Sequence, residues 1–183
     1  MNITNLIRFL KQVGKLKSLK RSGWIKNKIK KPDTSAEHSF RLAIMAMMLS
    51  PKLKVNQLKS VKMALIHDLG ESVIGDIITY RGSKIVSDPK IKSEKEIKAI
   101  EQIFSLINGK EYIKLFKEYE ENETKEAKFV KQLDKLETIL QALEYQQTDG
   151  KNLQEFFEWA ENNLTDKYFK KLLEEIEQER KYY

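Results

Sequence analysis

The residues best suited to chemistry are two histidines and two aspartates spread along the chain. The sequence has only two histidines: His38, in the stretch SAEHS, and His67, which Asp68 follows directly. Asp134 lies far downstream, between two leucines of an apolar helical pattern. Imidazole and carboxylate groups together suit Mn²⁺, Co²⁺, Fe²⁺, Ni²⁺ or Zn²⁺. We therefore expect these four residues to hold one divalent metal ion.

Each of these residues also has a simpler structural explanation. A lone histidine on an apolar helix is usually a satisfied core residue, and a lone aspartate is usually an exposed charge. A His-Asp pair can arise by chance. Neighbouring residues of a helix point about 100° apart, so His67 and Asp68 could reach one ion only from a helix end or a distorted turn. Gly70 would permit such a distortion. The presence of all four residues, in this order and on helices, favours metal binding.

The hydrophobic periodicity predicts an all-α protein, in which the four residues come from different helices. Apolar residues recur at three- and four-residue steps, and no segment shows sustained strand alternation. Pro51 is expected to end the helix that carries His38. The predicted helices cover residues 3–16, 35–49, 56–68, 89–107, 110–119, 124–147, 153–164 and 166–180. Residues 79–93, with Gly82 and Pro89, are the best candidate for a mobile loop near the site.

These elements predict one compact helical bundle of roughly eight or nine helices. Within it, we expect a basic N-terminal helix and connector at 1–34, a metal-binding core at 35–148 and C-terminal helices at 151–183. A chain of 183 residues is long enough to bury a substantial core in a single domain.

Composition narrows the function classes. The chain has no cysteine, which excludes disulfides and thiolate metal sites. Its longest apolar run, Leu42–Leu49, is too short to cross a bilayer, and we expect no signal peptide because Arg8 and Lys11 interrupt the apolar residues at the N-terminus. We expect a cytoplasmic protein without a membrane partner. Residues 1–32 hold ten Lys or Arg and no acid, which leaves a net charge of −3 for the rest. This arm could attract polyanions or be only a solvated face.

Three motifs around these residues resemble the 5′-deoxynucleotidase branch of the HD superfamily of phosphohydrolases. They are Ser35-Ala36-Glu37-His38, the stretch from Ile66 to Ile77 with its HDLGE and GDI elements, and the stretch from Glu126 to Glu137. That branch includes bacterial deoxynucleoside-monophosphate nucleotidases and the eukaryotic HD-domain-containing protein 2 group. The resemblance runs from about Arg21 to Tyr145, and the helices after Gly150 add little to it.

The resemblance implies roles for particular residues. It assigns metal binding to His38, His67, Asp68 and Asp134, with Mg²⁺ among the possible ions. It points to Glu71 as the carboxylate that orients or deprotonates the attacking water and places Asp76 near the sugar or that water. The simpler explanation for Glu71 and Asp76 is helix-end capping or solvation. The implied substrate is a deoxynucleoside 5′-monophosphate, and the implied assembly is a homodimer.

Substrate contacts are harder to assign. The family resemblance makes Arg21 and Trp24 candidates, although their spacing departs from the bacterial form, where the two are adjacent. A surface charge and a core anchor are the alternatives. Glu120, in an acidic run at 118–121, is a further candidate. The aromatic residues Phe156, Phe157 and Trp159 are interpreted as core or dimer packing and not as a base-stacking platform, because glutamates surround them.

Several functions fit the same residues. The leading hypothesis is a metal-dependent 5′-nucleotidase. A second enzyme hypothesis keeps the site and changes the substrate to another nucleotide or a phosphodiester. The chain has no histidine between Asp68 and Asp134, so a single-metal site is favoured over the two-metal phosphodiesterases. A non-catalytic RNA-binding helical protein with a structural metal site is the third hypothesis, although nucleic acid is not the expected partner.

Overall fold

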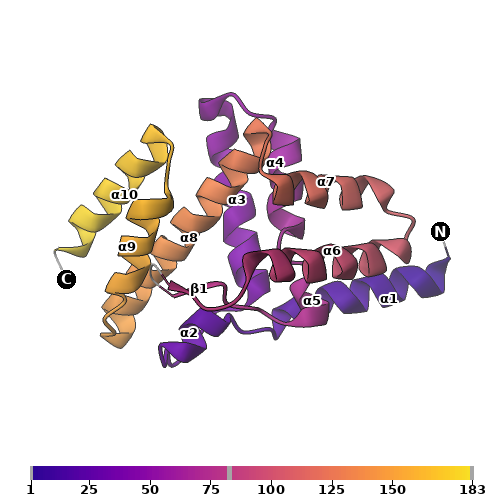
Figure 1. The fold of residues 1–183 in the computed structure, drawn as a ribbon, viewed down its shortest axis with the longest axis horizontal. Coiled ribbons are helices and arrows are strands. Elements are labelled where there is room, and N and C mark those ends of the chain that lie inside the picture. Colours follow the sequence, from indigo (N-terminus) through magenta and orange to yellow (C-terminus); the bar gives the residue numbers. More distant parts are fainter. Residues whose placement is uncertain (1, 82–83, 182–183) are drawn as a thin grey trace.

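The computed structural model describes residues 2–81 and 84–181 and confirms the all-α prediction (Figure 1). The helices are α1 (Ile3–Gly14), the 3-10 helix η1 (Lys15–Lys17), α2 (Ser22–Lys26), α3 (Ser35–Leu53), α4 (Gln57–Ile66), α5 (Glu71–Ile74), α6 (Pro89–Ser105), α7 (Lys110–Glu121), α8 (Lys125–Asp149), α9 (Gln154–Asn163) and α10 (Lys167–Arg180). Two short strands, β1 (Tyr80–Arg81) and β2 (Lys84–Ile85), pair antiparallel. None of the helices described is long and apolar enough to cross a membrane.

A capping box fixes the start of α3, which carries His38. The Thr34 side chain accepts a hydrogen bond from the Glu37 backbone N–H, and the Glu37 carboxylate accepts one from the Thr34 N–H. Two backbone donors that a helix start would leave unpaired are thereby satisfied. His38 follows one residue later and is fully buried. The cap therefore determines where the first predicted ligand enters the core.

The prediction that Pro51 ends this helix is wrong. The helix continues to Leu53 and closes at Lys54, whose left-handed backbone has a φ of 54°. Proline lacks the N–H that would bond to the carbonyl four residues earlier. That carbonyl, of Met47, instead accepts a hydrogen bond of 2.7 Å from the Gln57 side chain. Because the exposed carbonyl has another donor, the helix can run past the proline.

The second histidine and the aspartate that follows it lie at the end of α4. Helix α4 ends at Ile66, His67 is its C-cap residue, and a turn leads to α5. The expected helix end at the His-Asp pair is therefore observed. Gly70 in this turn lies against α6, where an added Cβ would come within 3.3 Å of the Glu96 carbonyl oxygen. A glycine is needed here because this close contact leaves little room for a side chain.

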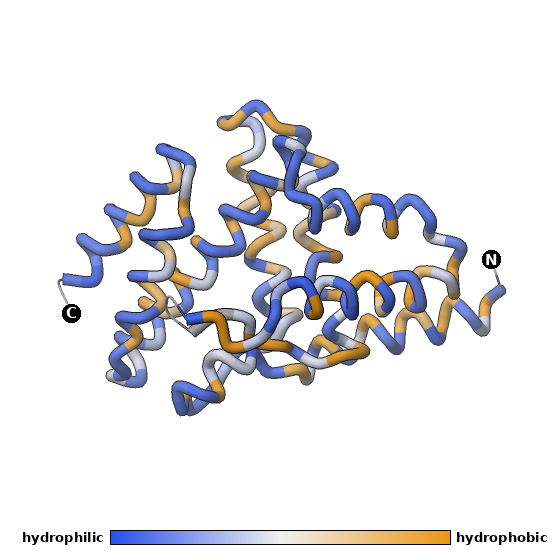
Figure 2. The backbone as a smooth tube through the Cα atoms, viewed as in Figure 1, coloured by the Kyte–Doolittle hydropathy of each residue, from blue (hydrophilic) through white to orange (hydrophobic). Residues whose placement is uncertain are grey.

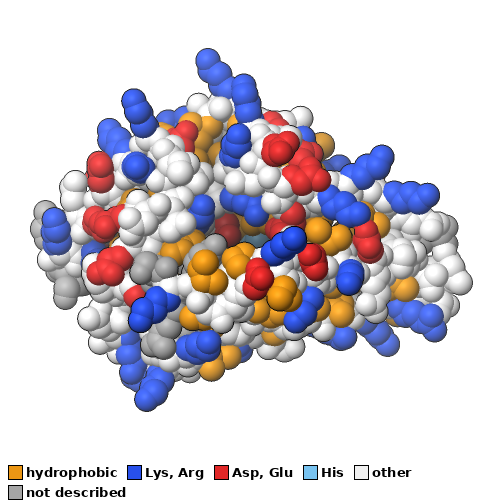
Figure 3. Space-filling model, viewed as in Figure 1, with side chains coloured by type: hydrophobic (Ala, Val, Ile, Leu, Met, Phe, Trp, Pro, Cys, Tyr) orange, Lys and Arg blue, Asp and Glu red, His pale blue; other side chains and the backbone are white. Residues whose placement is uncertain are grey.

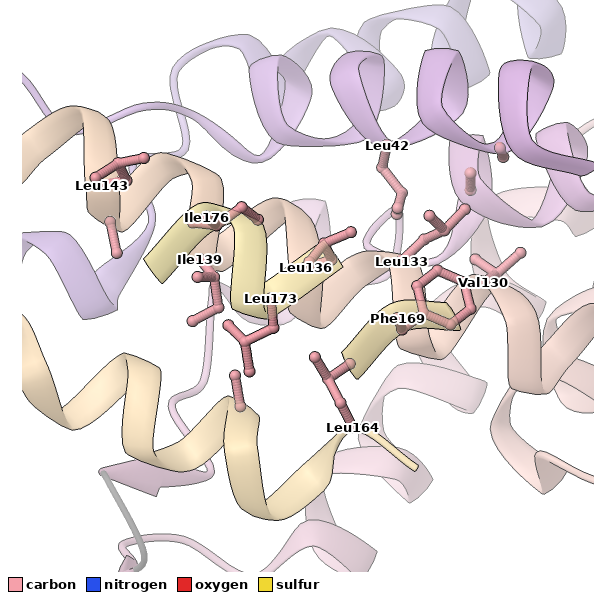
Figure 4. Packing of buried hydrophobic residues seen from close by; sticks show 14 of the residues in the cluster. Leu42, Val130, Leu133, Leu136, Ile139, Leu143, Leu164, Phe169, Leu173 and Ile176 are labelled. Carbon is pink, nitrogen blue, oxygen red and sulfur yellow. The ribbon is translucent and has the colours of Figure 1, made fainter. Parts of the chain in front are cut away.

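Helix α8 lies at the centre of the main core. Its buried residues Val130, Leu133 and Ile139 pack between α3 on one side and the C-terminal helices on the other, as Figure 4 shows. Asp134 and Glu137 interrupt this apolar row on the same helix. Figure 2 shows the resulting pattern: apolar positions face inward along the helices, and polar positions face outward.

A second cluster joins the N-terminal helix to α6 and α7. It contains Leu16, Ile66, Ile100, Phe104 and Phe116, with Phe9 of α1 packed against it. The rings of Phe9 and Phe104 lie 5.6 Å apart. Helix α1 therefore packs against the layer formed by α6 and α7.

Residues 79–93 were expected to form a loop, but much of this segment has regular secondary structure. The two strands form a small hairpin, and Asp88 caps α6, which already begins at Pro89. Gly82, expected within the loop, lies outside the described residues. The Asp88-Pro89 pair starts α6, because an aspartate cap followed by proline in the first turn is a favoured helix start.

The capping box can be tested by Thr34→Ala. We expect the free energy of unfolding to fall by about 1 kcal/mol, because the Glu37 N–H loses its partner at the helix start. Urea denaturation measures this change. Thr165→Ala, at an exposed threonine, is the matched control and should change stability by less than about 0.5 kcal/mol. Equal stability of the Thr34 variant and wild type would contradict the capping role.

Candidate active site

Four predicted ligand residues converge from three helices. His38 comes from α3, the pair His67 and Asp68 from the end of α4, and Asp134 from α8. The Nε2 atoms of the two histidines lie 3.2 Å apart. His38 Nε2 is 3.1 Å from Asp134 Oδ1, and His67 Nε2 is 3.2 Å from Asp68 Oδ2. His38, His67 and Asp134 each present one ligand atom within 4.8 Å of the others.

The remaining ring nitrogens fix what these histidines can bind. His67 Nδ1 lies 2.8 Å from the Ala64 carbonyl oxygen, and His38 Nδ1 is hydrogen-bonded to the Glu137 carboxylate. Both partners are acceptors, so each Nδ1 must carry the proton and each neutral imidazole keeps its lone pair on Nε2. Two lone pairs and two carboxylates then face one point, an arrangement that favours a positive charge among them.

This donor set fits a divalent metal ion. Ligand bonds of about 2.0–2.2 Å place neighbouring ligand atoms about 3 Å apart, which matches the separations between these Nε2 and carboxylate atoms. The Asp68 oxygen is 3.8 Å from His38 Nε2 and belongs to the same group. His67, Asp68 and Asp134 also line a pocket, so the group can be reached from outside.

The electrostatics of the group favour positive charge. Burial and Arg21 act to lower the pKa of His38, but Glu137 and Asp134 outweigh them and raise it to about 10. Burial would raise the pKa of Asp68 and Asp134, yet the facing imidazoles hold both pKa values well below their usual range. The aspartates therefore stay ionised at neutral pH and attract either a proton or a metal ion to the imidazoles.

Glu137 is a candidate functional residue that the sequence analysis did not single out. Its side chain is 1% exposed and holds His38 through Nδ1. Arg41 Nε donates a hydrogen bond of 2.9 Å to it, and Arg21 lies 3.6 Å away. A carboxylate behind a ligating histidine fixes the ring orientation and tautomer. The available signal was spacing, since Glu137 follows Asp134 by three residues and therefore shares its helix face.

Glu71 lies beside the four predicted metal ligands and does not line the pocket. Its carboxylate is buried, accepts a hydrogen bond of 2.9 Å from Ser35 Oγ and lies 3.6 Å from Lys92 Nζ. Burial and the charges of Asp68 and Asp76 raise the pKa of Glu71 well above its usual value. A carboxylate with a raised pKa is better suited to accept a proton near neutral pH. Lys92, from α6, was not foreseen.

Asp76 has the capping role that was its simpler explanation, and it also lines the pocket. Its Oδ2 accepts a hydrogen bond of 2.5 Å from the Ser22 N–H, at the start of α2. Ser22 Oγ donates to the Asp76 backbone carbonyl at 2.9 Å. Asp76 thereby ties α2 to the segment after α5 at the pocket edge.

Arg21 and Trp24, the two residues inferred from the family, line the same pocket. The Arg21 guanidinium donates to Thr138 Oγ1 at 3.3 Å and lies 6.0 Å from the Trp24 ring. Trp24 is only 1% exposed, so it is also a core anchor. Its Nε1–H has no hydrogen-bond partner among the described residues. Glu120, the remaining candidate, lines the pocket, pairs with Ser93 and lies 3.5 Å from Lys131 Nζ.

The pocket has a volume of about 470 Å³, within the usual range for small-molecule sites, about 300–1,000 Å³. Figure 3 shows it as a hollow near the middle of the face, with acidic side chains inside and Lys or Arg around it. Phe156 and Trp159 of α9 line it, whereas Phe157 is fully buried. The packing interpretation is confirmed for Phe157, and Phe156 and Trp159 also pack against the main core while lining the pocket.

Comparison with known proteins decides the family. The family model of the HD domain matches residues 13–178 of the chain. The chain belongs to the HD-domain family. This match extends beyond the 21–145 region in which the resemblance was recognised and includes α9 and most of α10. The C-terminal helices are thus part of the family fold.

Several known proteins resemble the chain over nearly its whole length. The 5′-deoxynucleotidase HDDC2 of Dictyostelium discoideum is 38% identical, covering 98% of this chain and 100% of the relative. The human 5′-deoxynucleotidase HDDC2 is 36% identical, covering 96% and 86%. Among solved structures, a conserved hypothetical protein from Pyrococcus furiosus has 34% identity and a TM-score of 0.76, covering 94% of this chain and 99% of that chain.

Glu137→Gln tests the carboxylate behind His38. We expect the affinity for Mn²⁺ to fall about 10- to 100-fold, because His38 loses the charged acceptor that orients it. Isothermal titration of chelator-treated protein measures this affinity. Glu144→Gln is the matched control. Glu144 lies on the same helix as Glu137 and binds Arg41 at 2.6 Å, but it does not touch His38. Unchanged Mn²⁺ affinity in the Glu137 variant would contradict the assigned role.

Proposed function

We propose that this protein is a metal-dependent 5′-nucleotidase that hydrolyses deoxynucleoside 5′-monophosphates to deoxynucleosides and phosphate. The observation that carries the proposal is the convergence of His38, His67, Asp68 and Asp134 at a pocket of nucleotide-compatible size. Membership of the HD-domain family and the names of the curated relatives support it.

We assign the four converging residues as ligands of one divalent ion, which could be Mn²⁺, Co²⁺, Fe²⁺, Ni²⁺, Zn²⁺ or Mg²⁺. When bound, such an ion lowers the pKa of water and neutralises phosphate charge. Structural metal sites are closed, whereas catalytic sites keep an accessible position. Three of the four ligands line the pocket, which favours a catalytic site over the structural site of the RNA-binding hypothesis.

Glu71 is the proposed general base. Its position beside Asp68, and its raised pKa, suit a group that accepts a proton from the attacking water. Ser35 and Lys92 hold its two carboxylate oxygens in place. Asp76, bound to the start of α2 and lining the pocket, would orient the sugar or the water. These roles of Glu71 and Asp76 stay predictions until tested.

Cationic side chains around the metal group would bind the phosphate. Arg21, Lys92 and Lys131 all line the pocket. Arg21 can contact a phosphate oxygen with two parallel N–H groups, and one of its terminal nitrogens has no hydrogen-bond partner among the described residues. Trp24 would lie against the sugar, with Glu120 holding Lys131 in place. A homodimeric assembly and a cytoplasmic location stay predictions.

Phosphate release tests the proposed activity. Chelator-treated wild-type protein, resupplied with one metal at a time, should release phosphate from deoxynucleoside 5′-monophosphates and favour them over ribonucleoside 5′-monophosphates. Nucleoside triphosphates and a phosphodiester complete the panel. Turnover only of these other substrates would keep the metal site but replace the proposed substrate. No turnover by folded, metal-loaded protein on any of them would contradict the proposal.

Glu71→Gln tests the proposed base. We expect kcat to fall about 10²–10⁴-fold, because the water loses its proton acceptor, while metal content stays at the wild-type level. Elemental analysis and phosphate-release kinetics measure the two quantities. Glu123→Gln, at an exposed site between α7 and α8, is the control. Wild-type kcat in the Glu71 variant would exclude this residue as the base.

A further inference from the structure

We propose that the outer end of the pocket, between α2 and α9, is a subsite for the nucleobase, with Phe156 and Trp159 as its aromatic surface. This inference rests on the proposed nucleotidase function and adds which part of the nucleotide each end of the pocket receives. It gives a binding role to two residues that also pack against the core and that were not expected to form a base-stacking platform.

Helix α2 sets the direction of the pocket. Arg21, Trp24 and Asn27 are spaced by three residues, so they follow one side of this short helix, and all three line the pocket. Arg21 is at the metal end, where it contacts Thr138, the residue one turn after Asp134 on α8. Asn27 is the C-cap, six residues further on, about 9 Å along the axis. Helix α2 thus forms one wall of the pocket, which runs from the predicted metal ligands outward.

Helix α9 supplies the facing wall of the outer end. The Phe156 ring stacks on Trp24 with centroids 4.6 Å apart and an interplanar angle of 27°. An added Cβ on Gly23 would lie 3.9 Å from the Phe156 ring, an ordinary contact distance, so α2 and α9 lie against each other at this position. Asn27 Nδ2 also lies 3.4 Å from Glu155 Oε1. Phe156 and Trp159 are three residues apart on α9 and both line the pocket.

The chemical character changes along the pocket. The metal end carries charged side chains, among them Asp68, Asp134 and Lys92, whereas the outer end adds the aromatic rings of Phe156 and Trp159 and two amides to the charged Lys26 and Glu155. A phosphate needs the cationic, metal-binding end, and a planar uncharged base suits aromatic faces. A nucleotide whose phosphate lies at the metal would therefore extend its base toward α9.

The outer wall should accept all four bases. The side-chain amide of Asn27 already donates to the Gly23 carbonyl at 2.9 Å, and that of Asn163 donates to the Trp159 carbonyl at 2.7 Å. Both N–H groups of Asn27 are thereby used, since the second faces Glu155, and one of the two of Asn163 is used. Stacking tolerates every base because each has a π-face. We expect the base to contribute to binding without strong discrimination among bases.

Phe156→Leu and Trp159→Leu test this subsite, since leucine keeps an apolar side chain but removes the aromatic face. The substrates are thymidine 5′-monophosphate and 2-deoxyribose 5-phosphate, which lacks a base. We expect kcat/KM for the nucleotide to fall about 5- to 100-fold, and kcat/KM for the sugar phosphate to change less than twofold. Phe40→Leu, at a 68% exposed phenylalanine outside the pocket, is the matched control.

Two outcomes would overturn the subsite while leaving the nucleotidase intact. One is an equal loss for both substrates, which would mean that α9 only supports the metal end. The other is a wild-type enzyme that hydrolyses the sugar phosphate as efficiently as the nucleotide.

Direct binding separates this inference from the proposed activity. Titration of metal-loaded Glu71→Gln protein with thymidine 5′-monophosphate should give a measurable Kd, and adding Phe156→Leu should weaken it about 5- to 100-fold. This result would support the subsite even if wild-type protein showed no turnover. An unchanged Kd in the double variant would overturn it.

Discussion

The structure depends on one electrostatic constraint: two buried imidazoles face each other with their Nε2 atoms 3.2 Å apart. Because the Ala64 carbonyl and Glu137 fix the proton of each ring on Nδ1, two lone pairs would meet without a positive charge between them. Asp68 and Asp134 add negative charge at the same point. A proton on His38, whose pKa is raised to about 10, can meet this need, and a divalent ion meets it better because it draws on all four donors.

The surrounding charges are arranged so that each buried carboxylate has a partner. Glu137 lies between His38 and the guanidinium groups of Arg21 and Arg41, and Lys92 lies between Glu71 and Glu96. Unpaired charges would be costly at this depth. Arg21 belongs to both the support of Glu137 and the wall of the pocket. Arg21 thus links the carboxylate behind His38 to the pocket, where we propose that it contacts substrate.

Much of this arrangement could be predicted from sequence. The four predicted ligand residues were recognisable because histidine is rare in the chain and each of them lies on, or at the end of, a helix that the apolar pattern predicts. Glu137 could not be distinguished from a surface carboxylate, because its burial depends on two arginines that are distant in sequence. Phe156 and Trp159 pack against the core as expected, but their place on the pocket wall could not be predicted, because it depends on how α9 lies against α2. Helix α3 ran past Pro51 because Gln57, beyond the helix, pairs the freed carbonyl.

The most direct test of the account is anomalous diffraction from crystals of the protein grown with Mn²⁺. We expect one strong anomalous peak per chain, bounded by His38 Nε2, His67 Nε2 and the carboxylates of Asp68 and Asp134. A pair of peaks would contradict the single-metal assignment. A peak elsewhere, with these four side chains holding no ion in Mn²⁺-saturated crystals, would contradict the claim that the imidazole pair is a metal centre.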